Sequence, residues 1–184
     1  MKEEYCVILD FLPNGYPDRR HAEPVAQAMG TSFFSLLELV PREGVNLAQE
    51  DDVYIGDGKR DKIRFIKGQL QYDELTNMAQ SLVEEVVGKI VAKNEARYVE
   101  FFNKAKLITP RMHQMQLLPG VGKKHLSDFL DERRKKPFAS LAEINQRVKF
   151  FPDPQKTIAA RVLEELRKDE KYCLFVNKPK KRQF

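Results

Sequence analysis

The sequence predicts an α+β protein in which a small β-barrel is followed by a series of short helices. Two observations carry this prediction. The first 70 residues contain short apolar, β-prone runs separated by proline, glycine and acidic residues, whereas the rest of the chain places apolar residues at helical spacing. With 184 residues and 42% hydrophobic content, the chain can bury one large core or two small ones, and we expect two.

Strand candidates dominate the first 72 residues. The clearest is the apolar run 5–12, which ends in the turn cluster Pro-Asn-Gly-Tyr-Pro. Several short strands without long helices between them need closure or a second sheet, so we expect an OB-like β-barrel domain at 1–72. The remaining candidates are 32–40, 52–56 and 63–70, and residues 21–29 form either a helical turn or another strand.

Residues 73–108 are predicted to form connecting helices. A broad apolar stripe at i, i+3 and i+4 runs from Leu75 to Val91, opposite acidic residues. A second helix passes through Tyr98 and Phe102, whose rings we expect in the core.

Residues 117–124 read Leu-Leu-Pro-Gly-Val-Gly-Lys-Lys, a pattern suited to holding a phosphate. Glycines let backbone N–H groups point outward together, the next helix adds the positive end of its dipole, and the lysines add charge. Thr109-Pro110 predicts the start of a helix of about two turns before this run. Helical spacing after it continues until Pro137.

This layout resembles the helix-hairpin-helix family, whose hairpin reads apolar-Pro-Gly-apolar-Gly. Residues 118–122 match that pattern. The resemblance implies that the hairpin amides contact a nucleic-acid phosphate, sometimes beside a monovalent cation, which would lie here at the 118–123 hairpin.

A second copy follows at an offset of 33 residues, where 150–163 aligns with 117–130 and Pro152 with Pro119. Its helices are indicated by a capping-box pattern at Ser140 and by Asp153-Pro154, an N-cap followed by proline. The second turn lacks glycine, so we interpret it as a packing partner rather than a phosphate site. The prediction is a tandem helix-hairpin-helix domain at 109–171, and then a strand at 172–176 and a basic tail within 172–184.

Charge is divided unevenly along the chain. Residues 93–184 contain 22 Lys and Arg against 11 Asp and Glu, whereas residues 1–92 contain 10 against 16. A basic half joined to an acidic half is typical of a protein that meets a polyanion, although a solvated lysine-rich surface gives the same pattern.

A second group of cations lies in residues 56–64, between two strand candidates. OB-like barrels bind single strands with such loops plus aromatic platforms, and Phe65 or Tyr54 is a candidate stacking residue. The alternative is an ordinary hairpin loop with solvated charges and aromatic rings that face the barrel core. The cations are Lys59, Arg60, Lys62 and Arg64.

Several function classes are excluded or disfavoured by what the chain lacks. No apolar stretch approaches the ~20 residues needed to span a bilayer, and residues 1–20 lack the order of a signal peptide, so we expect a cytoplasmic protein without a membrane partner. The glycine-lysine runs lack P-loop spacing. No metal-ligand spacing or nucleophile motif occurs, so we expect no catalytic residues and no metal. The two cysteines, Cys6 and Cys173, permit a disulfide but do not imply one.

Taken whole, the chain is similar to an archaeal family, domain of unknown function 655. The resemblance covers nearly the full length and is carried by the blocks 53–63 and 70–75 and by the hairpin 117–124. It implies an OB-like barrel followed by a tandem helix-hairpin-helix domain and a predicted RNA-binding role, and it implies no reaction.

We therefore expect a non-enzymatic nucleic-acid-binding protein, with RNA preferred over DNA. Two alternatives remain: a protein-interaction scaffold with a ribosomal or transcription partner, and a structure-specific nucleic-acid enzyme. In the expected mechanism, hairpin amides hold a phosphate, lysines neutralise it, and a following basic run extends the contact. The residues are Gly120, Val121, Gly122, Lys123 and Lys124, and then Arg133, Arg134, Lys135 and Lys136.

Overall fold

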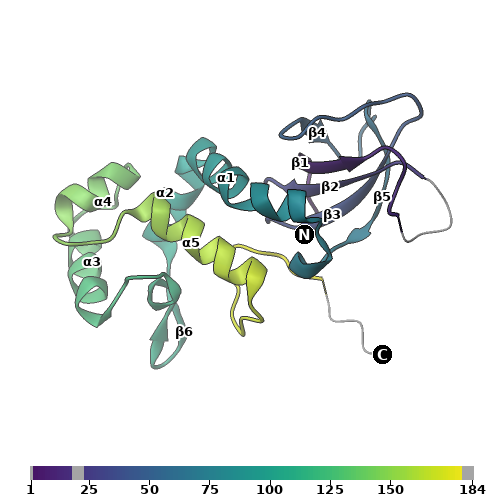
Figure 1. Ribbon diagram of the computed structural model, residues 1–184. Helices are drawn as coiled ribbons and strands as arrows, with labels where there is room; N and C mark the ends of the chain where they lie inside the picture. Colours follow the sequence, from purple (N-terminus) through teal and green to yellow (C-terminus); the bar gives the residue numbers. More distant parts are fainter. Residues whose placement is uncertain (1, 18–22, 180–184) are drawn as a thin grey trace. The chain divides into compact units, whose positions relative to one another are not determined.

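The computed structural model describes residues 2–17 and 23–179, and the chain divides into two compact units (Figure 1). One unit comprises the residues up to 86 together with those from 165 onward, and the other comprises 87–164. The C-terminal segment therefore joins the N-terminal sheet in one unit, although it lies at the opposite end of the sequence.

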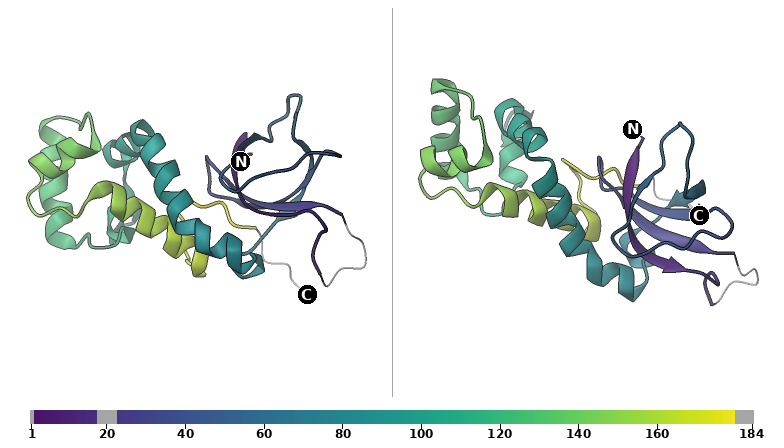
Figure 2. Two further views of the ribbon diagram at one scale, coloured as in Figure 1. Left: turned by 45° about the horizontal axis from the view of Figure 1, so that its top comes forward. Right: turned by 90° about the horizontal axis from the view of Figure 1, so that it is seen from above.

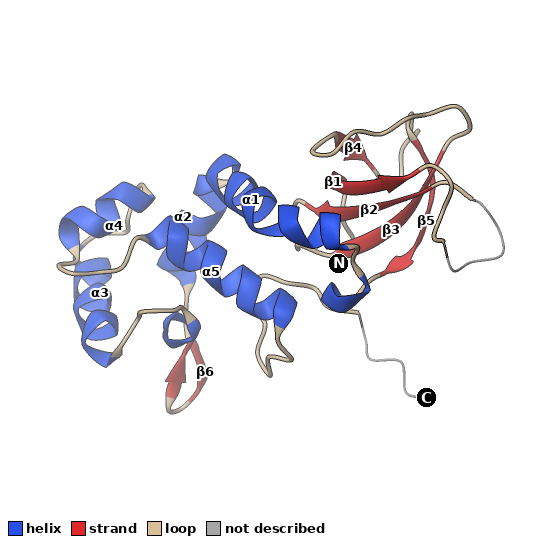
Figure 3. Cartoon of the chain, viewed as in Figure 1, coloured by secondary structure: helices blue, strands red, loops and turns tan. Residues whose placement is uncertain are grey.

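The first unit is built on a curled five-stranded antiparallel sheet with strand order β4-β1-β2-β3-β5 (Figure 3). The barrel-like sheet expected at 1–72 is present as a half-barrel, because in the described residues the two edge strands, β4 and β5, are not paired with each other; Figure 2 shows its curl from two directions. The strands are β1 Tyr5–Leu12, β2 Val25–Gly30, β3 Leu36–Pro41, β4 Asp52–Tyr54 and β5 Ile63–Gln69.

The strands form where the sequence predicted short apolar runs, and residues 25–30 resolve the open alternative in favour of a strand. Every residue of β2 and β3 is buried, as expected when both faces of a sheet are covered. One core uses alternate positions of β1, β2 and β3, and β4 and β5 add one residue each. It contains Cys6, Ile8, Ala26, Ala28, Leu37, Leu39, Leu47, Val53, Ile55 and Ile63.

A buried glutamine attaches the segment after the sheet to β2. The Gln27 side chain donates to the hydroxyl of Tyr16 (3.0 Å) and the carbonyl of Glu74 (3.1 Å), and it accepts from the Thr76 amide (2.8 Å). These bonds satisfy a fully buried polar group and fix the turn before the first long helix.

The helices are confirmed where apolar spacing was long and regular. Both connecting helices form, and the Asp153 carboxylate caps the last helix by accepting from the Lys156 amide (2.9 Å). The elements are η1 Tyr72–Glu74, α1 Asn77–Lys93, α2 Glu95–Lys104, β6 Leu107–Thr109, β7 Met112–His113, η2 Gln114–Leu117, α3 Lys123–Lys135, α4 Leu141–Arg147 and α5 Pro154–Arg167.

Phenylalanine rings form the core of the second unit. Phe129 of α3 is fully buried, and its ring centroid lies 5.8 Å from that of Phe102, 5.0 Å from that of Phe138 and 5.5 Å from that of Phe151. These contacts hold α2, α3 and the segments on either side of α4 together. The prediction that Phe102 lies in the core is therefore confirmed.

The prediction of a helix of about two turns after Thr109 is wrong. Residues 107–113 form the two-stranded β6-β7 hairpin, and only the short η2 precedes the glycine turn. The hairpin is favoured over a helix because hydrogen bonds between Lys106 and Gln114 join its ends. The Gln114 amide donates to the Lys106 carbonyl, and the Lys106 amide donates to the Gln114 side chain, both at 2.9 Å.

The strand expected at 172–176 is also absent. The amides of Leu174, Phe175 and Val176 donate instead to the buried carboxylate of Glu165, at 2.7, 2.9 and 3.0 Å. A single carboxylate thus takes the backbone donors that a neighbouring strand would have used. Cys6 is buried and Cys173 is exposed, and neither is in a disulfide; burial raises the pKa of the Cys6 thiol.

Candidate functional site

The predicted hairpin closes with a tight turn at residues 118–121. The Val121 amide donates to the Leu118 carbonyl (3.1 Å), and Gly120 has a φ of +82°. Proline at the second position and a left-handed glycine at the third are the residues of a type II turn. A Cβ on Gly120 would lie 3.5 Å from Pro152, an ordinary contact, so the backbone conformation and not the space demands glycine.

Helix α3 begins immediately after this turn with Gly122 as its N-cap. The Nδ1 atom of His125 lies 3.0 Å from the Gly120 carbonyl oxygen and 3.4 Å from the Gly122 nitrogen. A bare Nδ1 accepts from the Gly122 amide, whereas an Nδ1–H donates to the Gly120 carbonyl and releases that amide. Since the Val121 amide is bonded inside the turn, the donors that can face an anion are Gly122 and the first helical amides, and the expected role of the Val121 amide is corrected.

Two exposed lysines begin the helix. In the described part of the chain, the ammonium groups of Lys123 and Lys124 take part in no ion pair. Glycine at the N-cap supplies no side-chain acceptor, so neither a carboxylate nor a hydroxyl of the cap neutralises this helix end. The arrangement offers backbone donors, a helix dipole and two cations to one anion.

The basic run at the other end of α3 is already engaged. Arg133 donates to the carbonyls of Phe102 (3.0 Å) and Ala105 (2.8 Å), and burial, with the charge of Arg134 as the smaller cause, holds its pKa below the usual range. Arg133 is therefore a structural cap of α2, which corrects its expected place at the surface of the site. The next two residues form ion pairs with α3 itself, Arg134 with Asp131 (2.9 Å) and Lys135 with Glu132 (2.6 Å), and Lys136 is exposed.

The second hairpin has the same backbone turn with a different residue at its left-handed position. The Phe151 amide donates to the Val148 carbonyl (3.3 Å), and Phe150 has a φ of +57°. Phe150 thus occupies the position of Gly120, and the turns are offset by 30 residues rather than 33. The sequence alignment matched Pro152 to Pro119, but Pro152 follows its turn whereas Pro119 lies inside its own.

Two of the four sheet-side cations, Arg60 and Lys62, are bonded to neighbouring groups of the first unit. Arg60 donates through Nε to the Gly56 carbonyl (2.8 Å), and Lys62 pairs with Asp51 (3.1 Å). A backbone hydrogen bond from Ala48, and secondly the bond from Lys62, hold the pKa of Asp51 below its usual range. Arg64 lies 5.8 Å from the centroid of the Phe65 ring, and Lys59 is exposed.

Tyr54 is not an open stacking platform, because the loop folds over its ring. Its hydroxyl accepts from the Gly58 amide (3.0 Å), and a Cβ on Gly56 would lie 2.4 Å from that hydroxyl. The Tyr54 ring also meets the Tyr5 ring edge-on at 5.2 Å. Phe65 is 38% exposed on the edge strand β5 and stays a candidate for stacking.

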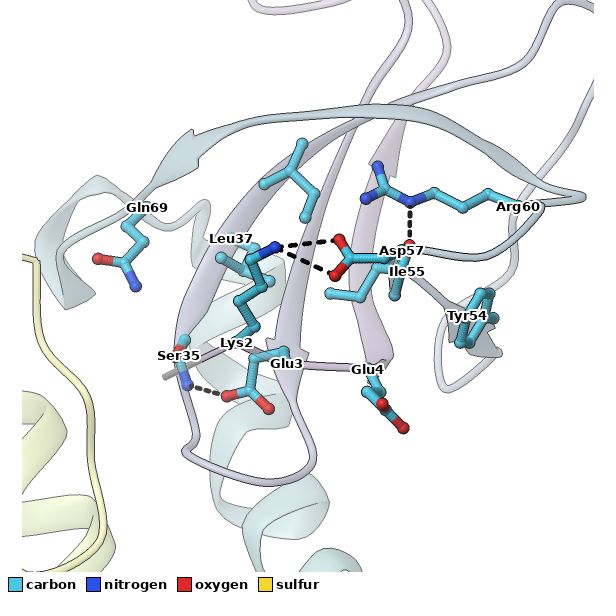
Figure 4. Close-up of a pocket in the computed structure, with 12 residues that line it drawn as sticks. Lys2, Glu3, Glu4, Ser35, Leu37, Tyr54, Ile55, Asp57, Arg60 and Gln69 are labelled. Carbon is cyan, nitrogen blue, oxygen red and sulfur yellow. Dashed lines mark hydrogen bonds and ion pairs between the residues drawn. The ribbon is translucent and has the colours of Figure 1, made fainter.

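A pocket of about 460 Å³ opens beside this loop (Figure 4). Lys2 and Asp57 form an ion pair at its mouth (3.1 Å), and the Glu3 carboxylate accepts from the Ser35 amide (3.2 Å). Its charged side chains are therefore of both signs and partly satisfied by one another, so the lining selects no anion or cation. The lining residues are Lys2, Glu3, Glu4, Ser35, Leu37, Tyr54, Ile55, Gly56, Asp57, Arg60, Ile66 and Gln69.

Within residues 2–17 and 23–179, no group of three or more His, Cys, Asp and Glu side chains is placed to hold a metal ion. No helix of that part is long and apolar enough to cross a membrane. A monovalent cation at the 118–123 hairpin stays a prediction; backbone carbonyls would coordinate it, and that of Leu118 already accepts from Val121.

Sequence reasoning missed two residues at this site, His125 and Phe150. His125 lies five residues after Gly120, and histidine at that spacing from a glycine turn carried no recognisable signal. Aligning the hairpins on their turn residues rather than their prolines would have shown a phenylalanine in a glycine position.

Comparison with known proteins places the whole chain in one family. A crystal structure of Af1531 from Archaeoglobus fulgidus has 43% sequence identity and a TM-score of 0.84, over 95% of this chain and 100% of that one. Uncharacterized protein MJ0038 of Methanocaldococcus jannaschii is 40% identical over 176 residues, which are 95% of this chain and 80% of the relative. The model of the family described as protein of unknown function (DUF655) matches residues 2–177, and the chain belongs to that family.

Proposed function

We propose that this protein binds nucleic acid, RNA in preference to DNA, without catalysing a reaction. The observation that carries the proposal is the start of α3, where the backbone donors of the first helical turn meet an N-cap without a side chain and two lysines, Lys123 and Lys124, that take part in no ion pair in the described part of the chain. This combination suits a phosphate group, whose oxygens accept several N–H bonds at once.

The difference in charge between the two units supports a polyanionic ligand at the unit that contains the glycine turn. Residues 87–164 carry 16 Lys and Arg against 8 Asp and Glu, whereas the remaining residues carry 16 against 19. An excess of positive charge in the unit that contains the hairpin attracts a phosphate backbone over a Debye length and accelerates encounter. This general attraction brings the nucleic acid to the unit, and the hairpin then binds one phosphate of its backbone.

The proposal also assigns a fold type to each of the two units. The half-barrel is taken as an OB-like sheet and the two turns with their flanking helices as a tandem helix-hairpin-helix domain, in which only the first hairpin holds phosphate. In the second, the Asp153 carboxylate already occupies the helix end by bonding the Lys156 amide (2.9 Å). The preference for RNA rests on the pairing with an OB-like sheet, since such sheets bind single strands and phosphate contacts alone favour neither nucleic acid.

Charge reversal at the hairpin tests the proposal. The double change Lys123→Glu and Lys124→Glu should weaken binding to all RNA sequences and flatten the log-log salt dependence by ~0.7 per lost phosphate contact for single strands. Fluorescence anisotropy with labelled oligonucleotides at several salt concentrations measures both quantities. The matched control is the double change Lys106→Glu with Arg111→Glu. It changes the net charge of the same unit equally, but both residues lie outside the glycine turn at 118–121 and the start of α3.

An equal loss in both double variants would show general attraction without a hairpin site. Wild-type protein that binds neither RNA nor DNA, but retains a protein partner after nuclease treatment, would favour the scaffold alternative. Metal-dependent cleavage of a branched or single-stranded substrate would favour the enzyme alternative.

A further inference from the structure

Phe150 is the most exposed large hydrophobic side chain in the described residues, at 89%. Scattered surface hydrophobics are ordinary, but this one also has a left-handed backbone, which phenylalanine rarely adopts. Glycine occupies the same position of the first hairpin, so a residue without strain was compatible with this turn. A strained and solvated ring at the tip of a turn points to a role outside the fold.

The ring stands on a rigid base. Phe151, the next residue, is buried, and its ring lies 6.1 Å from that of Phe102 and 5.5 Å from that of Phe129. The Phe151 amide closes the turn, and Pro152 restricts the chain that follows. Because the backbone on one side of Phe150 is anchored in the core, a ligand that covers the ring has little backbone freedom to immobilise.

The second hairpin also lies against the first. A Cβ on Gly120 would be 3.5 Å from Pro152, and the His125 ring lies 6.4 Å from the Phe151 ring. Phe150 is therefore two residues from a direct contact with the phosphate-holding turn. The side chain before it, Lys149, is exposed and takes part in no ion pair in the described part of the chain, so cations lie on both hairpins.

We propose that Phe150 is a stacking platform for an unpaired nucleobase, placed beside the phosphate held at the start of α3. The inference rests on the proposed function and assigns its ligand class: a single-stranded or locally unpaired segment, since a paired base within a duplex offers no free face. The first hairpin holds the backbone, and the second supplies the aromatic face. Stacking does not select among bases, because every base has a π-face.

Three substitutions at one position test this. Phe150→Ala and Phe150→Gly should lower affinity for single-stranded RNA about 5- to 150-fold, the range that corresponds to one base–aromatic stack. The salt dependence should remain unchanged, because no charge is lost, and Phe150→Tyr should retain binding. Glycine fits the left-handed backbone, so a weakened Phe150→Gly variant that unfolds no earlier than wild type rules out misfolding as the cause.

Fluorescence supplies a direct readout, because the chain contains no tryptophan. In a Phe150→Trp variant, added single-stranded RNA should quench the indole emission, and an oligonucleotide with abasic positions should not. Leu107→Trp, at an exposed position of β6 that has no part in the proposed site, is the matched control, and its emission should change less.

Three outcomes overturn the inference. The first is wild-type protein that binds RNA and loses affinity on charge reversal at Lys123 and Lys124, while all Phe150 variants bind normally. The second is equal loss of duplex and single-strand binding in Phe150→Ala. The third is self-association that disappears in Phe150→Ala while RNA binding persists. Failure of the proposed function is distinct from these, since wild type would then bind no nucleic acid.

Discussion

The two hairpins of the second unit share one backbone turn but place opposite residues at its left-handed position. The turn at 118–121 uses Gly120, and the turn at 148–151 uses Phe150. Glycine adopts this conformation freely, whereas a side chain there costs about 1–2 kcal/mol. The first turn leaves bare backbone, and the second accepts strain to present a ring to solvent.

The helix ends that follow the turns differ in the same direction. Gly122 caps α3 without a side chain, and Asp153 caps α5 with a carboxylate that accepts from Lys156. A helix end satisfied by its own acid repels a second anion, whereas an end capped by glycine carries no acid that would repel one. The likeness between the two hairpins therefore lies in the turn, and it does not extend to the helix end where we propose the phosphate site.

The largest expected effect separates the two neighbouring phenylalanines of the second hairpin. Phe151→Ala should lower the free energy of unfolding by about 3–5 kcal/mol, because a buried ring in contact with three others is removed. Phe150→Ala should change it by less than about 1 kcal/mol, since its ring is solvated. Urea unfolding, monitored by circular dichroism, measures both free energies. Equal destabilisation by the two changes would contradict the assignment of Phe151 to the core and of Phe150 to the surface.

A smaller effect compares the two glycines of the first hairpin. Gly120→Ala should destabilise the protein by about 1–2 kcal/mol, because its φ of +82° is unfavourable for alanine. Gly122→Ala has an extended backbone and no atom within 4 Å of the added Cβ, so we expect less than about 1 kcal/mol. The same urea titration applies; a larger cost at Gly122 would contradict the assigned turn.

The smallest effect concerns pH at the entrance to the first hairpin. Burial, and secondly the charge of Arg133, hold the pKa of His113 below its usual range, against a bond to the Ala105 carbonyl that raises it. The stability that neutral His113 contributes is full above its unfolded pKa of about 6.5 and declines as pH falls from there toward the folded pKa. Protonated His113 can no longer accept from the Met115 amide (3.1 Å).

Hydrogen exchange, corrected for its intrinsic pH dependence, checks this at single residues. Protection of the Met115 and Leu118 amides should fall between pH 7 and pH 5, whereas protection of the Phe151 amide should not. A His113→Gln variant should remove the difference. Parallel loss at all three amides in the wild type would show that acid acts on the whole unit instead.

Features that depend on neighbouring residues were predicted well. The run 5–12 forms β1 with the expected bounds, and Pro119-Gly120 forms the expected turn, because strand propensity and turn chemistry are local. The helix after Thr109 failed for the opposite reason. Hydrogen bonds between Lys106 and Gln114 favour a hairpin, and no local pattern encodes them.

The sequence by itself determined four of the five half-barrel strands, the long helices and a glycine turn before a helix that begins with two lysines. Only the tertiary structure decided which cations are open to a ligand. Arg133 looks free in a basic run, yet it bonds carbonyls about 30 residues earlier, while Lys123 and Lys124 do not pair. Tertiary packing also placed Pro152, which follows the Phe150 turn, against Gly120. The reason is physical: turn geometry depends on adjacent residues, whereas the exposure and pairing of a charge depend on groups distant in the chain.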